Sequence, residues 1–249
     1  MLGIFDSGVG GLTVVRELLR RHPNAAFEYL GDTARTPYGT KGPETIQRYA
    51  VEDVQYLIEQ GAHTIVVACN TVSAHAMEVL RTRFTAVRFI DVIEPAVRCV
   101  PAAAHVGIIG TSATIRSGVY ERLIRERNPA AVVHSVACPL FVPLVEEGWF
   151  SGPVVERVVA SYLHPLKELD IDTLILGCTH YPMLQSAIRS YLDPKVRMID
   201  SPTAVLNAAD LGFEPGRQRY AFTDLSETAC TMIKRCNGKC LKPKQILLH

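Results

Sequence analysis

Short β-rich runs alternate with longer helical patterns along most of the chain, and this alternation constrains the fold more than any other feature. Eight runs are predicted to be strands, at residues 2–5, 27–30, 64–68, 87–91, 106–109, 132–137, 173–176 and 197–199. Helical patterns lie between them, for example at residues 12–22, 44–61 and 154–166. Such alternation favours parallel sheets with helices on both faces. Ligands of these sheets bind beyond the carboxyl ends of the strands.

The chain also carries a weak internal repeat. The segment GIFDSGVGG from Gly3 resembles GIIGTSATI from Gly107, and TIVVACNT from Thr64 resembles TLILGCTH from Thr173. The two matches occur in the same order and at similar offsets, which indicates two related halves. We therefore predict an α/β fold of two pseudo-symmetric doubly wound parallel-sheet domains, with the active site in the cleft between them.

Length and composition fit this prediction. A chain of 249 residues accommodates two cores of ordinary size, and 48% hydrophobic with 20% charged residues is typical of globular proteins. The predicted domains are residues 1–92 together with a returning tail at 201–249, and residues 93–200. A net charge of +1, with 26 basic residues scattered against 25 acidic ones, argues against a nucleic-acid partner.

The N-terminal segment MLGIFDSGVGG lacks a basic region and carries Asp6 among its apolar residues, so it does not resemble a signal peptide. We therefore expect a cytoplasmic location. The longest uncharged run, residues 128–145, is interrupted by three prolines and a histidine, which argues against a membrane span. The seven cysteines are accordingly expected to be reduced.

Two cysteines occupy matching positions in the repeat. One apolar run ends on Cys69, with Asn70 and Thr71 directly after it, and the other ends on Cys178, with a threonine and a histidine after it. If the two halves are equivalent, both cysteines lie at the carboxyl ends of corresponding strands. Packing of the halves face to face would then place one thiol on each side of a small bound molecule.

Two opposed thiols are suited to the inversion of a carbon centre. Inversion removes a proton from one face of the carbon and delivers another to the opposite face, which requires two acid–base groups. A thiol has a reference pKa of about 8.5 that its surroundings can lower, so both of its protonation states are accessible. The alternative is that both cysteines only pack in the core, as buried cysteines often do. Their pairing, with polar residues after each, favours the chemical interpretation.

Three further residues are candidates for orienting the thiols. Asp6 ends the first predicted strand, His180 lies two residues beyond Cys178, and Glu146 follows an apolar stretch. Each also has a purely structural interpretation. Asp6 would then cap the following helix, His180 would be a core histidine, and Glu146 would be a solvated surface charge.

Two polar loops are candidates for substrate binding. DSGVGGLT follows the first strand, but it matches neither a dinucleotide fingerprint nor a phosphate-binding loop, so a small carboxylate or ammonium group next to Ser7 fits better. The segment GDTARTPYGTKG, residues 31–42, offers Asp32, Tyr38 and backbone amides. Its structural alternative is a turn rich in glycine and proline.

The other cysteines are interpreted differently. Cys99 and Cys138 fall in apolar stretches and are predicted to be core residues. Cys236 and Cys240 form a C-x-x-x-C pair, with Cys230 shortly before it. A zinc site normally needs four ligands and no paired histidines lie nearby, so we predict no metal site in the tail.

Five blocks of the sequence resemble the aspartate/glutamate racemase family, and within it the glutamate racemases. The blocks are GIFDSGVGGLTV, GDTARTPYG, ACNT, CPLFVPLVEEG and GCTHYP, between residues 3 and 182 and in the family's order. The resemblance implies cofactor-independent and metal-independent racemisation of L-glutamate to D-glutamate by two thiols. It also implies that the product supplies peptidoglycan, and hence cell-wall biogenesis and cell shape.

The resemblance further implies roles for individual residues. The implied catalytic residues are Cys69, Cys178, Asp6, His180, Asp32 and Glu146. The implied substrate-binding residues are Asp6, Ser7, Pro37, Tyr38, Gly39, Asn70, Thr71, Thr114, Thr179 and His180. The sequence departs from the family pattern at Val72 and Thr36, and the pattern is weak beyond about residue 210.

Other functions stay open at this point. One alternative is an aspartate racemase or another amino-acid racemase of the same family. From other classes, the alternatives are a thiol hydrolase or lyase with one nucleophilic cysteine, and a catalytically silent binding protein that acts on a partner enzyme. A homodimer is one assembly compatible with the sequence.

Overall fold

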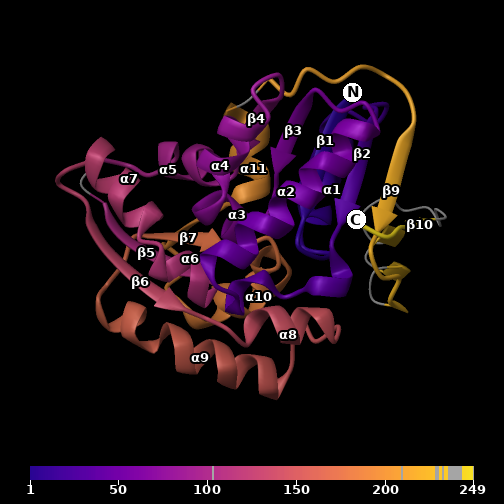
Figure 1. The fold of residues 1–249 in the computed structure, drawn as a ribbon. Helices are drawn as coiled ribbons and strands as arrows, with labels where there is room; N and C mark the ends of the chain where they lie inside the picture. The colour runs from indigo at the N-terminus through magenta and orange to yellow at the C-terminus, as the bar shows by residue number, and fades with distance from the viewer. Residues whose placement is uncertain (103, 209, 228–229, 232, 235–242, 249) are drawn as a thin grey trace.

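Two parallel β-sheets form the frame of the molecule (Figure 1). The structure is a computed structural model that describes residues 1–102, 104–208, 210–227, 230–231, 233–234 and 243–248. The first sheet has the strand order β10-β9-β2-β1-β3-β4 and the second has the order β6-β5-β7-β8. In chain order, the strands are β1 (Leu2–Asp6), β2 (Phe27–Gly31), β3 (Thr64–Val67), β4 (Arg88–Asp91), β5 (His105–Gly110), β6 (Val132–Ala137), β7 (Thr173–Gly177), β8 (Arg197–Asp200), β9 (Gln218–Phe222) and β10 (Lys244–Gln245).

The two sheets repeat one topology. Strands β2-β1-β3-β4 and β6-β5-β7-β8 follow the same spatial order, with the first strand of each half between the second and the third. The register is repeated as well, since Leu2 pairs with Thr64 in the first sheet and Val106 pairs with Thr173 in the second. The fold class predicted from the sequence, two pseudo-symmetric doubly wound parallel sheets, is therefore confirmed.

Helices cover both faces of each sheet, as Figure 1 shows. The α-helices are α1 (Leu12–Arg21), α2 (Pro43–Glu59), α3 (Asn70–His75), α4 (Met77–Arg83), α5 (Ile93–Arg98), α6 (Ser112–Arg116), α7 (Val119–Arg127), α8 (Phe141–Glu146), α9 (Pro153–Glu168), α10 (Gln185–Tyr191) and α11 (Ser201–Ala208). Three short 3-10 helices are η1 (Thr33–Arg35), η2 (Tyr38–Thr40) and η3 (Tyr181–Leu184). Among the described residues, none of the helices combines the length and apolarity needed to cross a membrane.

Strand periodicity divides the core of each half into two layers. Leu2 and Ile4 of β1 pack with α1, whereas Phe5 on the opposite face of the same strand packs with α2. In the second sheet, Leu174 and Ile175 of β7 likewise belong to different layers. Burial on both faces explains why these strands have continuous apolar sequences. Because neighbouring strands are parallel, their carboxyl ends lie together at one edge of each sheet.

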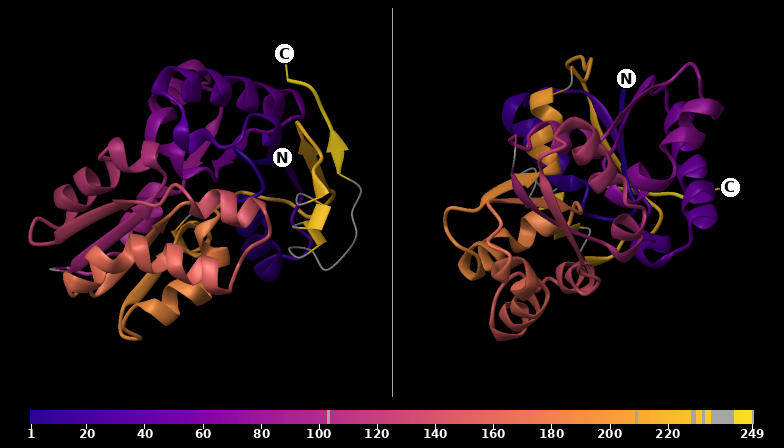
Figure 2. Two further views of the ribbon diagram at one scale, coloured as in Figure 1. Left: turned by 90° about the horizontal axis from the view of Figure 1, so that it is seen from below. Right: turned by 90° about the vertical axis from the view of Figure 1, so that its left-hand side faces the viewer.

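All eight strands predicted from the sequence are present, with bounds that agree within one residue. Strands β9 and β10 were not predicted. They extend the edge of the first sheet, where β9 pairs in parallel with β2 and β10 pairs with β9, and Figure 2 shows them along this edge.

Candidate active site

Cys69 and Cys178 both line one small cavity at the carboxyl ends of the two sheets. Cys69 lies two residues after β3, at the N-cap position of α3, while Cys178 directly follows β7. Their exposed fractions are only 4% and 5%. The cavity has a volume of about 20 Å³, which holds about one water molecule. Its walls are Ser7, Thr36, Pro37, Tyr38, Gly39, Cys69, Asn70, Thr71, Thr111, Val142, Cys178, Thr179 and His180.

Cys178 lies next to a histidine that is paired with a carboxylate. Nδ1 of His180 lies 3.8 Å from Sγ of Cys178, and Nε2 of the same ring lies 2.6 Å from Oε1 of Glu146. Burial alone would lower the pKa of His180, but its interactions with Cys178 and Glu146 raise that pKa well above the usual value. A protonated imidazole next to a thiol stabilises the thiolate. His180 is therefore placed to stabilise a negative charge that develops on the sulfur of Cys178.

Cys69 has the opposite electrostatic environment. Its thiol donates to Oγ of Ser7 at 3.4 Å, and Asp6 lies behind it. Burial, followed by the charge of Asp6, raises the pKa of Cys69 to about 12, so this thiol stays protonated. The two cysteines of the cavity thus have unlike charged neighbours, a histidine next to Cys178 and a carboxylate next to Cys69. A thiolate and a thiol on one cavity are the pair that proton removal and proton delivery require.

Asp6 connects the two halves of the site. Its Oδ2 accepts the Gly8 N–H at 3.1 Å, and its Oδ1 accepts the Thr179 hydroxyl at 3.0 Å. Complete burial raises the pKa of Asp6, while nearby His180 acts against this shift. Asp6 itself does not line the cavity. It positions Thr179, which does line it.

Three threonine hydroxyls form a compact polar wall. Oγ1 of Thr71 lies 2.9 Å from Oγ1 of Thr111 and 3.3 Å from that of Thr114, and the last two are 2.9 Å apart. Thr111 also caps helix α6 by accepting the Thr114 N–H. Thr111 lines the cavity but was not predicted from the sequence. The internal repeat could have identified Thr111 as a candidate, because the alignment of the two halves matches Thr111 with Ser7.

The loop after β2 forms another part of the wall and is held by a buried acidic cluster. The hydroxyl of Tyr38 donates to Asp32 and, at 3.0 Å, to Oδ2 of Asp53. Asp32 also accepts the Thr223 hydroxyl at 2.8 Å and pairs with Arg35. Asp32 therefore lies behind Tyr38, not at the thiols. Asp53 was not singled out from the sequence, although it is fully buried here.

Most residues proposed from the sequence converge on the cavity. Ten of them line it: Ser7, Pro37, Tyr38, Gly39, Cys69, Asn70, Thr71, Cys178, Thr179 and His180. The other four proposed residues each hydrogen-bond to a residue that lines it, and they are Asp6, Asp32, Thr114 and Glu146. Thr36 and Val142 line the cavity as well, without having been assigned a role. The catalytic and binding roles themselves stay predictions.

The remaining cysteines are placed as follows. Cys138 is buried in the core and Cys99 is half-buried at the end of α5, and both have free thiols. Cys236 and Cys240 lie outside the described residues. Within the described part of the chain, no group of three or more His, Cys, Asp or Glu side chains is arranged to hold a metal ion.

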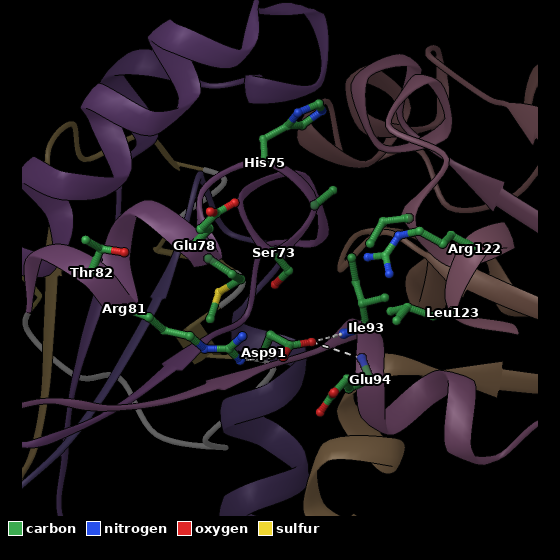
Figure 3. Close-up of a pocket in the computed structure, with 13 residues that line it drawn as sticks. Ser73, His75, Glu78, Arg81, Thr82, Asp91, Ile93, Glu94, Arg122 and Leu123 are labelled. Atoms are coloured by element: carbon green, nitrogen blue, oxygen red, sulfur yellow. Dashed lines mark hydrogen bonds and ion pairs between the residues drawn. The ribbon is translucent and has the colours of Figure 1, made fainter. Parts of the chain in front are cut away.

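A second and larger pocket lies away from the thiols, between helices α3, α4, α5 and α7 (Figure 3). Its volume is about 570 Å³, and it shares no lining residue with the thiol cavity. Asp91 is its central charged group. One carboxylate oxygen accepts the N–H groups of Ile93 and Glu94, both at 2.9 Å, and the other pairs with Arg81 at 3.3 Å.

Comparison with known proteins places the chain in a family. The sequence profile of the family described as Asp/Glu/Hydantoin racemase matches residues 10–209. The chain belongs to the Asp/Glu/Hydantoin racemase family. The family resemblance predicted from the sequence is therefore confirmed.

Glutamate racemases are among the most similar relatives of this family member. The chain is 43% identical to the glutamate racemase of Aquifex aeolicus over 249 residues, covering 98% of this chain and 96% of that protein. It is 47% identical to the glutamate racemase of Geobacter metallireducens over 203 residues, covering 80% and 75% of the two proteins.

Solved structures agree with the sequence comparison. A crystal structure of glutamate racemase from Francisella tularensis, in complex with D-glutamate, superposes with a TM-score of 0.90 at 37% identity. The match covers 99% of this chain and 96% of that one. The family member described here therefore has the glutamate racemase fold over nearly its whole length.

Proposed function

We propose that this protein is a glutamate racemase that interconverts L-glutamate and D-glutamate without a cofactor or a metal ion. Relatives with this name cover nearly the whole chain at 43% identity, and a superposing structure holds D-glutamate. The protein is accordingly an isomerase. Its product would supply peptidoglycan synthesis, the role that the family implies.

The single observation that carries the mechanism is the pairing of two unlike cysteines on one cavity. The Cys178 thiolate would accept the Cα proton of glutamate from one face. The Cys69 thiol would donate its proton to the opposite face, which leaves Cys178 as a thiol and Cys69 as a thiolate. The reverse reaction restores the starting states, so the same two groups serve both directions.

The surrounding residues support this chemistry. His180, held by Glu146, would stabilise the thiolate form of Cys178. Asp6 favours the neutral thiol of Cys69 through its charge. Hydroxyl and amide groups of Ser7, Thr71, Thr179 and Asn70 would bind the amino acid. The cavity is too small for glutamate in this state, so its walls must move apart for entry.

The proposal also covers the cellular location and the oligomeric state of the enzyme. We place the enzyme in the cytoplasm, because two acid–base thiols require a reducing compartment and all the cysteines recorded in the described residues are free. A homodimer remains a prediction that sedimentation of the purified protein would test.

Circular dichroism of L-glutamate incubated with the purified protein tests the proposal directly. The signal should decay to zero, because a racemase brings both enantiomers to equal concentrations. L-Aspartate, assayed in parallel, should decay far more slowly. Faster inversion of aspartate would indicate the aspartate racemase alternative instead. A stable acyl-enzyme on one cysteine, without inversion, would indicate a hydrolase.

A further inference from the structure

Two hydroxyl groups from helices other than its own hydrogen-bond to the side chain of Asn70. It is the first residue of α3, directly after Cys69, and its exposed fraction is 2%. Its Oδ1 accepts the hydroxyl of Tyr120, on α7, at 2.6 Å and the hydroxyl of Ser201, at the start of α11, at 3.4 Å. Both hydroxyl groups therefore act on the same edge of the amide.

The other edge of this amide is unsatisfied. Nδ2 of Asn70 is buried but has no hydrogen-bond partner among the described residues. Buried polar groups nearly always have a hydrogen-bond partner. A buried group without one, in a candidate functional site, indicates that an atom of a bound ligand would be its partner. Asn70 lines the thiol cavity, so its free N–H groups are available to a molecule bound there.

The orientation of the amide decides which groups a substrate meets. An asparagine side chain has similar shape in its two orientations, but one edge donates hydrogen bonds and the other accepts them. A substrate carboxylate needs donors. If the amide flipped, Oδ1 would face the carboxylate and repel it. Two hydroxyl groups donate to Oδ1 from the far side, and a flip would require both of them to give up this donation and accept instead, which disfavours the flip.

We propose that Tyr120 and Ser201 are positioning residues that fix the Asn70 amide with its N–H groups toward a carboxylate of the bound amino acid. This inference rests on the proposed function, because it assumes a carboxylate substrate in the thiol cavity. Tyr120 and Ser201 are not among the residues that line the thiol cavity. They act through Asn70, and neither was singled out from the sequence.

The packing around Tyr120 allows its hydroxyl to be tested apart from its ring. A Cβ atom placed on Gly177 would lie 3.2 Å from Cε2 of Tyr120, so the ring packs against the strand end that precedes Cys178. Tyr120→Phe keeps this contact and removes only the hydroxyl. Ser201→Ala removes the second donor with little change in volume. Each variant removes one of the two hydrogen bonds to Oδ1 of Asn70, one from α7 and the other from α11.

Steady-state kinetics of glutamate racemisation test the inference. Tyr120→Phe should raise KM about tenfold while kcat changes less than about threefold, because the lost orientation weakens substrate and transition state alike. Ser201→Ala should raise KM in the same way but less, since its bond is longer. A matched control is Tyr56→Phe, which removes a hydroxyl that donates to Glu28 at 3.3 Å, and it should leave KM unchanged.

A double-mutant cycle separates positioning from a general structural role. In an Asn70→Ala background, Tyr120→Phe should have no further effect on kcat/KM, because the side chain through which it acts is gone. Equal further losses with and without Asn70 would overturn the inference, as would wild-type KM in both single variants. If Tyr120→Phe does not fold, Ser201→Ala completes the same cycle. Failure of the wild-type protein to invert glutamate would instead refute the proposed function, and this inference with it.

Discussion

His180 and Glu146 form a largely buried ion pair at 2.6 Å, between Nε2 of the ring and Oε1 of the carboxylate. The ring's other nitrogen faces the Cys178 thiol, so the pair joins helix α8 to the residue that would accept a proton from the substrate. On this side of the cavity, the structure supplies a positive charge next to sulfur. On the Cys69 side, it supplies the negative charge of Asp6. The difference between the two sides leads to the following predictions.

Glu146→Gln should weaken the support of the Cys178 thiolate. Glutamine keeps the size of the side chain but loses the charge that helps to raise the pKa of His180. The imidazolium form should then be lost at a lower pH. The alkaline limb of the pH profile of kcat/KM should move down by about one unit, with a loss of about tenfold at pH 8.

The adjacent and exposed Glu147 provides the control, because Glu147→Gln leaves the ion pair intact. Its pH profile should match that of the wild-type protein. In each variant kcat/KM must remain equal for the two enantiomers, because they have equal free energies in solution. An unshifted alkaline limb in Glu146→Gln would show that Glu146 does not act on His180.

Asp53→Asn should change how stability depends on pH. Burial, followed by the charge of Asp32, raises the pKa of Asp53 well above its usual value of 3.8. The folded protein therefore holds a proton that the unfolded chain releases above about pH 4. The stability that this proton contributes is present below that pH and is lost as pH rises through the folded pKa, by up to about 1.4 kcal/mol per pH unit. The asparagine side chain of the variant cannot titrate, so the loss should disappear.

Urea unfolding between pH 4.5 and 7.5 measures this effect. The free energy of unfolding of the wild-type protein should fall more steeply with pH than that of Asp53→Asn. Asp170→Asn, at an exposed turn, should keep the wild-type slope. Equal slopes in the wild-type protein and Asp53→Asn would mean that Asp53 is ionised across this range.

Gly10→Ala should reduce activity by displacing His180. A Cβ atom at Gly10 would collide with Oγ1 of Thr179 and with Nδ1 of His180, and it would lie 2.7 Å from Cε1 of that ring. Displacement of a catalytic group by about 1 Å can cost on the order of 100-fold in rate, so we expect a loss of about 10- to 100-fold in kcat/KM. The racemisation assay measures it.

Gly42→Ala serves as the comparison, because the nearest atom to its added Cβ is Glu44 Oε2, at 3.7 Å. It should retain full activity. Full activity in Gly10→Ala, with an unchanged melting temperature, would show that the close approach of Gly10 to His180 does not matter for catalysis.

Much of the fold was predictable because it follows from local patterns. Continuous apolar runs such as residues 173–176 mark strands buried on both faces, and this strand is present with nearly the predicted bounds. The repeat then placed Cys69 and Cys178 at equivalent strand ends. Parallel pairing brings such ends to one edge of each sheet, and the packing of the two halves brings the two cysteines to one cavity.

The missed features depend on contacts between distant segments. Strand β9 forms by pairing with β2, nearly 200 residues earlier in the chain, and its own sequence has no clear strand pattern. Asp53 interrupts the apolar stripe of α2, and only the approach of Tyr38 and Asp32 explains its burial. Val142 reaches the cavity because α8 packs beside it, which the sequence did not indicate.

Replacement of either thiol of the cavity should abolish inversion in both directions. Cys69→Ser and Cys178→Ser each replace a thiol by a hydroxyl whose pKa lies far above neutrality, and a missing acid–base group costs about 100- to 10,000-fold. Cys99→Ser, at a half-buried free thiol at the end of α5, is the control and should keep wild-type activity. Substantial inversion by either site variant would mean that one thiol suffices.

Deuterium incorporation during racemisation in D₂O tests the two-thiol account most directly. If Cys69 and Cys178 act on opposite faces of Cα, the proton removed stays on one sulfur and the delivered deuteron comes from the other. Mass spectrometry at early times should therefore find deuterium at Cα in nearly all of the product enantiomer and very little in the recovered substrate. Deuterium that appears in the recovered substrate as fast as in the product would show that a single base exchanges its proton with solvent, and would contradict the account.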